Sequence, residues 1–137
     1  MKSLFSFGLS LLVTTFSWAQ ETKIIEIQKA GSSQQDQERF PGATILLSDT
    51  SQRVHLFHEG ALVVSDRAYF YAKRNFFKAQ GEVVFTQGDS LKLTCQFIEY
   101  EGGTRQAKAW GKVVLKKPDM TLETDTLYLD RIANKAF

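Results

Sequence analysis

From residue 43 onward, apolar and polar residues alternate along the chain with few interruptions. Residues 77–85 read Phe-Lys-Ala-Gln-Gly-Glu-Val-Val-Phe, and residues 107–115 follow the same order of apolar and polar positions except at Trp110. Alternation rich in Val, Leu, Phe, Tyr and Thr is typical of strands that bury one face. No stretch of 11 residues keeps apolar residues at the helical spacing i, i+3, i+4 and i+7. The pattern therefore predicts an all-β fold.

The alternating segments recur at intervals of 29 to 30 residues. Gln-Gly-Glu-Val-Val-Phe at residues 80–85 returns as Trp-Gly-Lys-Val-Val-Leu at residues 110–115. Leu-Lys-Leu-Thr at residues 91–94 likewise resembles the segments at 61–64 and 120–123. Turn-forming residues, such as the Gly-Asp pair at 88–89 and the Pro-Asp pair at 118–119, separate the units. Each unit is thus predicted to be a pair of strands joined by a turn.

In each unit the apolar parity shifts by one residue at the same repeat position. The middle unit places Leu93 and Cys95 on one parity and continues with Ile98 on the other. The position of the shift is occupied by Asp66, Gln96 and Asp125 in the three units. A strand shifts parity in this way where it bulges or bends sharply and passes from one sheet to a facing one. The repeats therefore predict bent hairpins that build a sandwich or jelly-roll with open edges.

The inward positions are apolar and uncharged, whereas the outward positions are mostly charged. One interpretation is a filled core; the other is a slot between the two sheets for an apolar ligand such as an acyl chain. Small inward residues, including Ala61, Ala79 and Ala109, slightly favour a slot. The candidate lipid-binding residues are Val54, Leu56, Val63, Phe70, Phe77, Val83, Phe85, Leu91, Leu93, Ile98, Tyr100, Val113, Leu115, Met120, Leu122, Leu127 and Leu129.

The N-terminal segment, residues 1–19, is expected to be a cleavable signal peptide. Lys2 is its only charge, residues 4–16 are apolar or small, and Ser17 and Ala19 suit the positions before a cleavage site. The apolar run is shorter than the roughly 20 residues of a membrane span. Residues 20–42 are expected to hold a strand near 23–27 and a polar loop over 31–38, and residues 43–137 the repeats. The sequence predicts an exported protein.

Composition excludes several classes of protein. The 137 residues carry 17 Lys and Arg against 15 Asp and Glu, so the net charge of +2 gives no reason to expect a nucleic-acid partner. One cysteine rules out an intrachain disulfide, and the alternation places Cys95 on the apolar inner face. His55 and His58 lie three residues apart on one predicted strand and point to opposite faces, which opposes metal binding. We expect no metal and no cofactor.

No pattern of residues predicts catalysis. The chain has no nucleophile elbow, phosphate-binding loop or dinucleotide fingerprint. Asp66, Asp125 and Asp130 fall at corners or turns, where we expect them to hydrogen-bond to the backbone rather than to transfer protons. We therefore expect a protein that is not an enzyme.

The repeat resembles the OstA-like family, which includes the periplasmic lipopolysaccharide-transport protein LptA and the N-terminal domain of LptD. The segments that carry the resemblance are residues 79–85, 88–93, 109–115, 120–125 and 125–130. The resemblance implies an open, V-shaped β-jelly-roll whose inner faces shield lipid A acyl chains between the inner and outer membranes. It also implies edge-to-edge association with homologous β-jelly-roll proteins or domains. Gln96 departs from the Asp of the other units, so that corner is expected to be held differently.

The resemblance places the chain in the periplasm, in association with the outer membrane. The third unit stops before the strand expected near position 140, so we expect a chain that continues or an edge that pairs with something else. Two alternatives to a lipopolysaccharide carrier stay open. One is a structural β-solenoid module with a dry core that acts through its edge strands; the other is the N-terminal periplasmic domain of a longer outer-membrane lipopolysaccharide-assembly protein.

Overall fold

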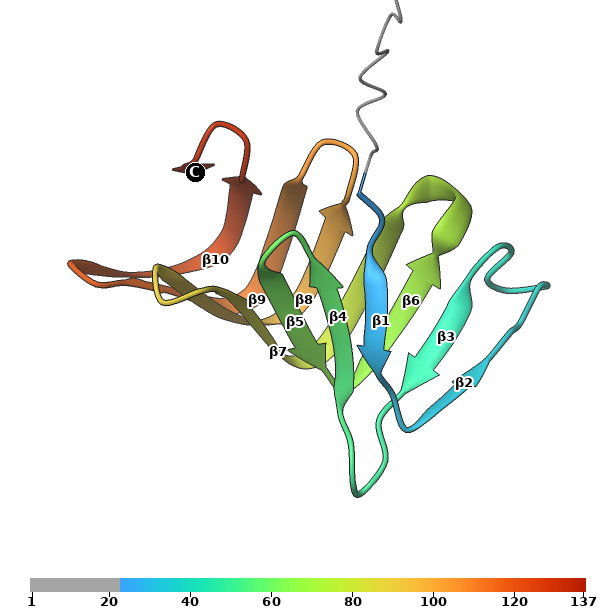
Figure 1. The fold of residues 1–137 in the computed structure, drawn as a ribbon. Coiled ribbons are helices and arrows are strands. Elements are labelled where there is room, and N and C mark those ends of the chain that lie inside the picture. Colours follow the sequence, from blue (N-terminus) through green and yellow to red (C-terminus); the bar gives the residue numbers. More distant parts are fainter. Residues whose placement is uncertain (1–22) are drawn as a thin grey trace, which may run out of the picture.

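The computed structural model describes residues 23–137, and its regular secondary structure consists almost entirely of strands (Figure 1). The predicted signal peptide lies outside the described residues. A single 3-10 turn, η1 (Ala72–Arg74), connects two of the strands. The strands are β1 (Glu26–Lys29), β2 (Ser32–Gln34), β3 (Thr44–Leu47), β4 (Val54–His58), β5 (Ala61–Ser65), β6 (Arg67–Tyr71), β7 (Phe76–Gln87), β8 (Leu91–Glu101), β9 (Gln106–Lys117), β10 (Met120–Asp130) and β11 (Lys135–Ala136). The predicted all-β class is confirmed.

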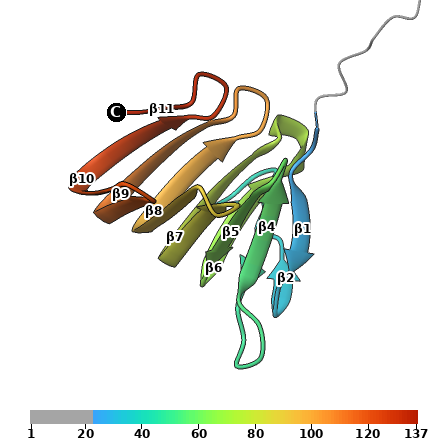
Figure 2. The same ribbon diagram turned by 60° about the vertical axis from the view of Figure 1, so that its left-hand side comes forward.

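One antiparallel sheet contains all of these strands and is bent into two arms (Figures 1 and 2). The long strands β7 to β10 run through the bend and contribute to both arms. In the first arm, β1, β4 and β5 continue the sheet beyond residues 84–87 of β7. In the second arm, β2, β3 and β6 continue it beyond residues 76–80 of β7, and β11 is added to the end of β10. The sheet stays open, as the repeats predict.

The bend of β7 is a β-bulge at Gly81 and Glu82. These two residues lie opposite the single residue Gln96 of β8, because the register jumps from Gln80–Phe97 to Val83–Cys95. Both bulge residues have positive φ, 83° for Gly81 and 43° for Glu82, which is the conformation that glycine adopts most readily. One extra residue on one strand explains why apolar parity shifts on β8 and not on β7. The predicted bend at the position of the parity shift is confirmed, but the bulge lies on the neighbouring strand β7 rather than on β8 itself.

The same bulge recurs one repeat later, at Gly111 and Lys112 of β9. Their φ angles are 80° and 51°, and they lie opposite Asp125 of β10. Repetition of the bulge in alternate strands bends every long strand at the same level. This alignment of bulges is what divides the sheet into two arms.

Asp66 and Arg53 hold the first corner. The N–H of Asp66 donates to the carbonyl of Gly81 at 3.0 Å, while its carboxylate accepts from the Arg53 guanidinium at 3.1 Å. Arg53 also donates to the carbonyls of Gly81 and Glu82, at 3.1 and 2.7 Å. The expectation that the Asp66 carboxylate bonds to the backbone is therefore wrong, because the guanidinium of Arg53, just before β4, bonds both to this carboxylate and to the bulged carbonyls.

The other corner residues behave differently. Within residues 23–137, the side chain of Gln96 forms no hydrogen bond, so the second corner does differ from the first, as expected. Asp130 does bond to the backbone: its carboxylate accepts from the N–H groups of Ile132 and Ala133, both at 3.0 Å. These bonds hold the pKa of Asp130 below its ordinary value.

The N-terminal region departs from the prediction in two ways. The first strand begins at Glu26 rather than Lys23, and the expected polar loop contains the short strand β2. All three residues of β2 are exposed, and the strand is held by backbone pairing with β3. A strand exposed on both faces carries no apolar alternation, so the sequence pattern gave no signal for it.

Candidate functional site

The inner faces of the two arms form one continuous apolar surface. Most of the candidate lipid-binding residues are buried there, with an exposed fraction of 5% or less. Phe70 and Leu91 are partly buried against the same cluster. Met120 and Leu122, near the start of β10, are 45% and 37% exposed, so the apolar surface is uncovered at that end of the first arm. The buried members are Val54, Leu56, Val63, Phe77, Val83, Phe85, Leu93, Ile98, Tyr100, Val113, Leu115, Leu127 and Leu129.

Tyr100 is the central side chain of this inner surface. Its ring stacks on Phe77 within the second arm, with ring centres 5.4 Å apart. It also contacts two rings of the first arm, Phe85 at 6.4 Å and His58 at 5.4 Å. Aromatic contacts at these distances contribute to packing beyond the area that they bury. Tyr100 therefore joins the two arms across the interior.

His58 is a buried polar residue in this apolar interior, only 3% exposed. Its Nε2 lies 2.9 Å from the carbonyl of Lys23 and its Nδ1 lies 2.7 Å from the hydroxyl of Tyr100. A carbonyl can only accept, so Nε2 carries the proton, and in the neutral ring Nδ1 accepts from the Tyr100 hydroxyl. His55 points to the other face, as expected, with its Nδ1 3.0 Å from the carbonyl of Arg53. The pair cannot share a ligand.

Neither thiol nor carboxylate chemistry is assembled at the inner surface. Cys95 lies inward, as expected, and burial raises the pKa of its thiol to about 12, an effect that the backbone N–H of Phe97 partly offsets. The thiolate that nucleophilic or metal-binding cysteines need is therefore strongly disfavoured. In residues 23–137, no group of three or more His, Cys, Asp or Glu side chains is placed to hold a metal ion.

Two arginines close the open end of the arms, which we call the mouth. Here the turn between β4 and β5 in the first arm faces the turns that follow β8 and β10 in the second. Arg131 donates to the carbonyls of His58 and Glu59, at 3.1 and 2.7 Å, and to the hydroxyl of Tyr100 at 2.9 Å. Arg105 bonds both carboxylate oxygens of Glu59, one of them at 2.8 Å.

The ion pair at the mouth sets the protonation of Glu59. Desolvation raises the pKa of this carboxyl, but the hydrogen bond and the charge of Arg105 outweigh it and hold the pKa below its ordinary value. Sequence reasoning missed the charged residues that join the arms at the mouth, Glu59, Arg105 and Arg131. They lie in turns far apart in the chain, and neither periodicity nor a motif marks them.

The space at the mouth is small. A pocket of about 20 Å³ lies between the ends of the arms, with Phe85, Leu91 and Leu129 on its apolar side. That volume holds about one water molecule and no acyl chain. The interior of the observed conformation is therefore a packed core, and the mouth has to widen before a chain can enter.

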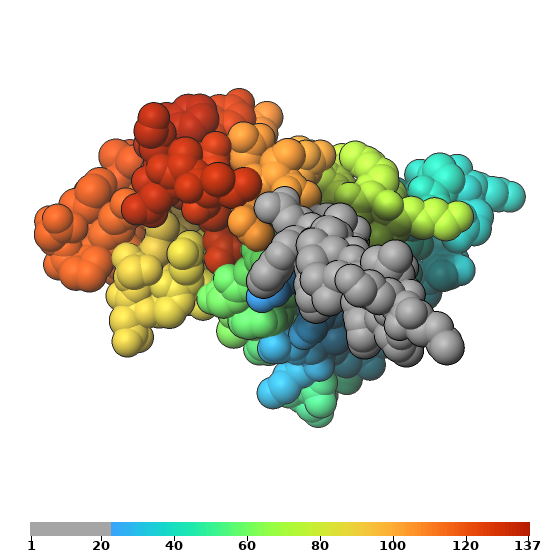
Figure 3. Space-filling view, turned by 45° about the horizontal axis from the view of Figure 1, so that its top comes forward, coloured from blue at the N-terminus to red at the C-terminus, as the bar shows by residue number. Residues whose placement is uncertain are grey.

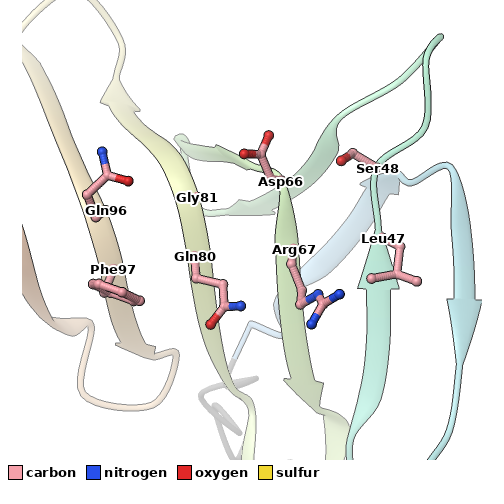
Figure 4. A pocket seen from close by; sticks show the side chains of 8 residues that line it. All are labelled: Leu47, Ser48, Asp66, Arg67, Gln80, Gly81, Gln96 and Phe97. Atoms are coloured by element: carbon pink, nitrogen blue, oxygen red, sulfur yellow. The ribbon is translucent and has the colours of Figure 1, made fainter.

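A larger hollow, of about 570 Å³, lies on the outer side of the corner (Figure 4). Gln80, Arg67 and Phe97 line it from neighbouring strands, with Asp66 and Gln96 at the bend. The hollow is open and partly polar, and it lies on the face of the sheet opposite the apolar interior. It is therefore separate from the candidate site.

Fold and site together define a class: a bent, open β-jelly-roll with an apolar inner surface and no assembled catalytic group among residues 23–137. The chain belongs to the OstA-like protein family, whose model matches residues 21–137. This membership supports the expectation that the protein is not an enzyme. Among the curated proteins, none matches the chain. No helix within residues 23–137 has the length and apolar character needed to cross a membrane.

Twelve chains of solved structures match the fold. One is the crystal structure of LptH from Pseudomonas aeruginosa, described as the LptA-homologous periplasmic component of the conserved lipopolysaccharide transport device. The two chains are 13% identical and superpose with a TM-score of 0.68, over 82% of this chain and 80% of LptH. The similarity confirms the predicted jelly-roll architecture.

Proposed function

We propose that the chain is a periplasmic lipopolysaccharide carrier that shields lipid A acyl chains between its two arms. Membership of the OstA-like family and the fold shared with LptH support this function. The observation that carries it is the inner surface itself, which crosses both arms without a single Lys, Arg, Asp or Glu among its candidate residues. An apolar surface of this extent suits acyl chains, whose burial contributes roughly 0.8 kcal/mol for each methylene.

Binding in this way requires the arms to separate. The arms are joined covalently only at the corner, through the bent strands and the connections β1–β2, β3–β4 and β5–β6, whereas across the interior they meet through side chains such as Tyr100 and Phe85. An acyl chain that enters replaces these contacts with contacts of similar chemistry, so no empty cavity is left behind. Transport by this route needs no covalent step, and no cofactor is involved.

The edges of the sheet fit association with similar domains. Within the described residues, β1 pairs only with β4, and residues 120–126 of β10 pair only with β9. Strands paired on one side present open backbone groups to a further strand. We include in the proposal that homologous jelly-roll proteins or domains add to these edges and extend the apolar surface. The signal peptide at residues 1–19 would deliver the chain to the compartment where this occurs.

The close packing of the interior favours a second candidate, a structural module with a dry core that acts through its edges alone. The 20 Å³ pocket at the mouth is what such a module would have. The two functions differ in one respect that can be measured, namely whether lipid ever contacts the inner residues.

Photocrosslinking in cells separates the two functions. A photoreactive phenylalanine analogue would replace Leu91, which is half-buried at the mouth, and Leu122, which is inward and 37% exposed. Lys116, exposed on the outer face, is the control. We expect lipopolysaccharide adducts at Leu91 and Leu122 and none at Lys116. Exported, folded variants that give no adduct at either inner position would overturn the carrier function in favour of the structural module.

A further inference from the structure

The charge of Arg131 is not neutralised by any carboxylate within residues 23–137. Its guanidinium donates four hydrogen bonds, and all four acceptors are neutral: two backbone carbonyls, the Tyr100 hydroxyl at 2.9 Å and the side-chain amide of Gln87 at 3.2 Å. Arg53 and Arg105, by contrast, are each paired with a carboxylate. A half-buried guanidinium among neutral acceptors keeps the capacity to bind an anion strongly.

Arg131 also spans the mouth. It follows β10 in the second arm, and three of its four acceptors, the carbonyls of His58 and Glu59 and the amide of Gln87, belong to the first arm. Figure 3 shows the C-terminal turn, in red, close to the turn between β4 and β5, in green. Removal of Arg131 from these acceptors would leave the Arg105–Glu59 ion pair and the His58–Tyr100 hydrogen bond between the arms at this end.

The pocket beside Arg131 is amphipathic. Its inner side consists of Phe85, Leu91 and Leu129, whereas Lys117 and Lys135 stand on its rim with Arg131. Asp130 is the single carboxylate that lines it, and that side chain is occupied by backbone N–H groups and Gln106. The pocket therefore presents three positive charges next to the entrance of the apolar interior. That arrangement matches the junction between an anionic headgroup and its acyl chains.

We propose that Arg131 is an anion-binding residue that takes a phosphate group at the mouth, supplied by a phosphorylated, acylated lipid, and that phosphate binding releases the first arm. A phosphate oxygen forms charge-assisted hydrogen bonds about twice as strong as those to neutral acceptors. In the closed state the Arg131 guanidinium joins the arms. A phosphate that binds this guanidinium takes it away from the first arm and therefore favours the open state. This inference rests on the proposed carrier function, for which it names the headgroup chemistry and the contact residue.

Binding measurements with three probes test the site. The probes are lipid A, lipid A stripped of its phosphates, and inorganic phosphate, each titrated into the purified chain. We expect Arg131→Gln to weaken binding of lipid A at least tenfold but not to weaken binding of the stripped lipid, because the variant loses contacts that hold the arms closed. Arg131→Lys keeps the charge but loses the planar guanidinium, so its affinity for lipid A should lie between those of the unmodified chain and Arg131→Gln. Lys116→Gln, on the outer face, is the matched control and should bind both lipids as the unmodified chain does.

The outcomes separate the anion site from the carrier function. If Arg131→Gln, Arg131→Lys and the unmodified chain bind lipid A with equal affinity, the proposed anion site is overturned and the carrier function is still supported. If neither lipid binds but inorganic phosphate raises the thermal stability of the unmodified chain and not of Arg131→Gln, the site stands and the carrier falls. If phosphate has no Arg131-dependent effect either, both are overturned. Circular dichroism of each variant checks folding. If Arg131→Gln does not fold, Arg131→Lys is compared with the unmodified chain instead.

A distance measurement tests the release of the arm. Spin labels at Asp89→Cys in the first arm and Gly103→Cys in the second, in a Cys95→Ala background, report the width of the mouth. Both positions are exposed, and a Cβ at Gly103 meets no atom within 4 Å. The distance should increase when lipid A is added and stay constant with the stripped lipid. A constant distance with lipid A bound would overturn the release, because phosphate would then bind without widening the mouth.

Discussion

The carboxylate of Asp66 occupies the space where a side chain at Gly81 would begin. A Cβ built on Gly81 would lie 2.6 Å from Oδ2 of Asp66 and 2.8 Å from its Cβ. A glycine is thus needed at position 81 for two reasons: the positive φ of 83° and the close approach of the neighbouring strand. The bend that creates two arms depends on this contact between two residues 15 positions apart.

Three glycine substitutions should separate backbone strain from steric conflict. Gly81→Ala should destabilise the chain by about 2 to 4 kcal/mol, because strain and a clash add. Gly60→Ala has the same strain, with φ 85°, but meets no atom within 4 Å, so about 1 kcal/mol is expected. Gly103→Ala should change the unfolding free energy by less than about 0.5 kcal/mol. Urea denaturation measures all three, and equal values for Gly81→Ala and Gly60→Ala would contradict the clash with Asp66.

Removal of the Tyr100 hydroxyl should reveal how the arms are joined. Tyr100→Phe keeps the ring contacts but leaves the buried Nδ1 of His58 without its donor and takes one acceptor from Arg131. We expect a loss of about 1 to 3 kcal/mol in unfolding free energy, the usual penalty for a buried polar group left unpaired. Tyr71→Phe is the control, since Tyr71 is only half-buried and no hydrogen bond of its hydroxyl is present in the described part of the chain. A Tyr100→Phe variant as stable as Tyr71→Phe would show that the network contributes nothing.

The corners could be predicted from the sequence because each of them shifts the alternation of apolar residues along the chain. The extra residue of the bulge lies on β7, so its partner β8 crosses the bend with one residue fewer, and Cys95 and Ile98 both point inward although they lie three positions apart. The bulge at Gly111 is accompanied by the same shift in apolar alternation on its partner strand. The inner surface follows from the same alternation, which is why nearly all of its residues could be named before the fold was known.

The mouth could not be predicted, because its contacts join turns rather than strands. Arg131 bonds to His58 across 73 positions, and nothing in the local pattern at either end signals the other. Periodicity does not reveal the closed conformation either. The same alternation of apolar residues is expected whether the inner surface packs against the other arm or against an acyl chain. The alternation therefore defines the candidate surface but leaves its occupant to experiment.

The ion pair at the mouth should make stability depend on pH in acid. The folded-state pKa of Glu59 lies below its ordinary value of 4.5, so the ionised carboxylate stabilises the fold above that value and this contribution is lost as the pH falls through the folded-state pKa. At pH 7 we expect Glu59→Gln to be less stable than the unmodified chain by about 1 kcal/mol. As the pH falls below 4.5 the difference between the two should narrow.

Urea unfolding at several pH values measures this convergence. Glu123→Gln provides the control, because Glu123 is exposed and has no ion pair within residues 23–137. A constant gap between Glu59→Gln and the unmodified chain from pH 7 to 3 would mean that the pair with Arg105 does not contribute through its charge.

Cys95 should react slowly as long as the arms are closed. Burial raises the pKa of its thiol to about 12, so at pH 8 the thiolate fraction is about a thousand times smaller than for an exposed cysteine with an ordinary pKa near 8.5. We expect an aromatic disulfide reagent to label the native chain at least a thousandfold more slowly than the chain in urea. Lys116→Cys in a Cys95→Ala background serves as the exposed control and should react at nearly the same rate in both conditions. Fast labelling of native Cys95 would mean that the inner surface is open to water, and the packed interior described above would then be a minor state of the protein.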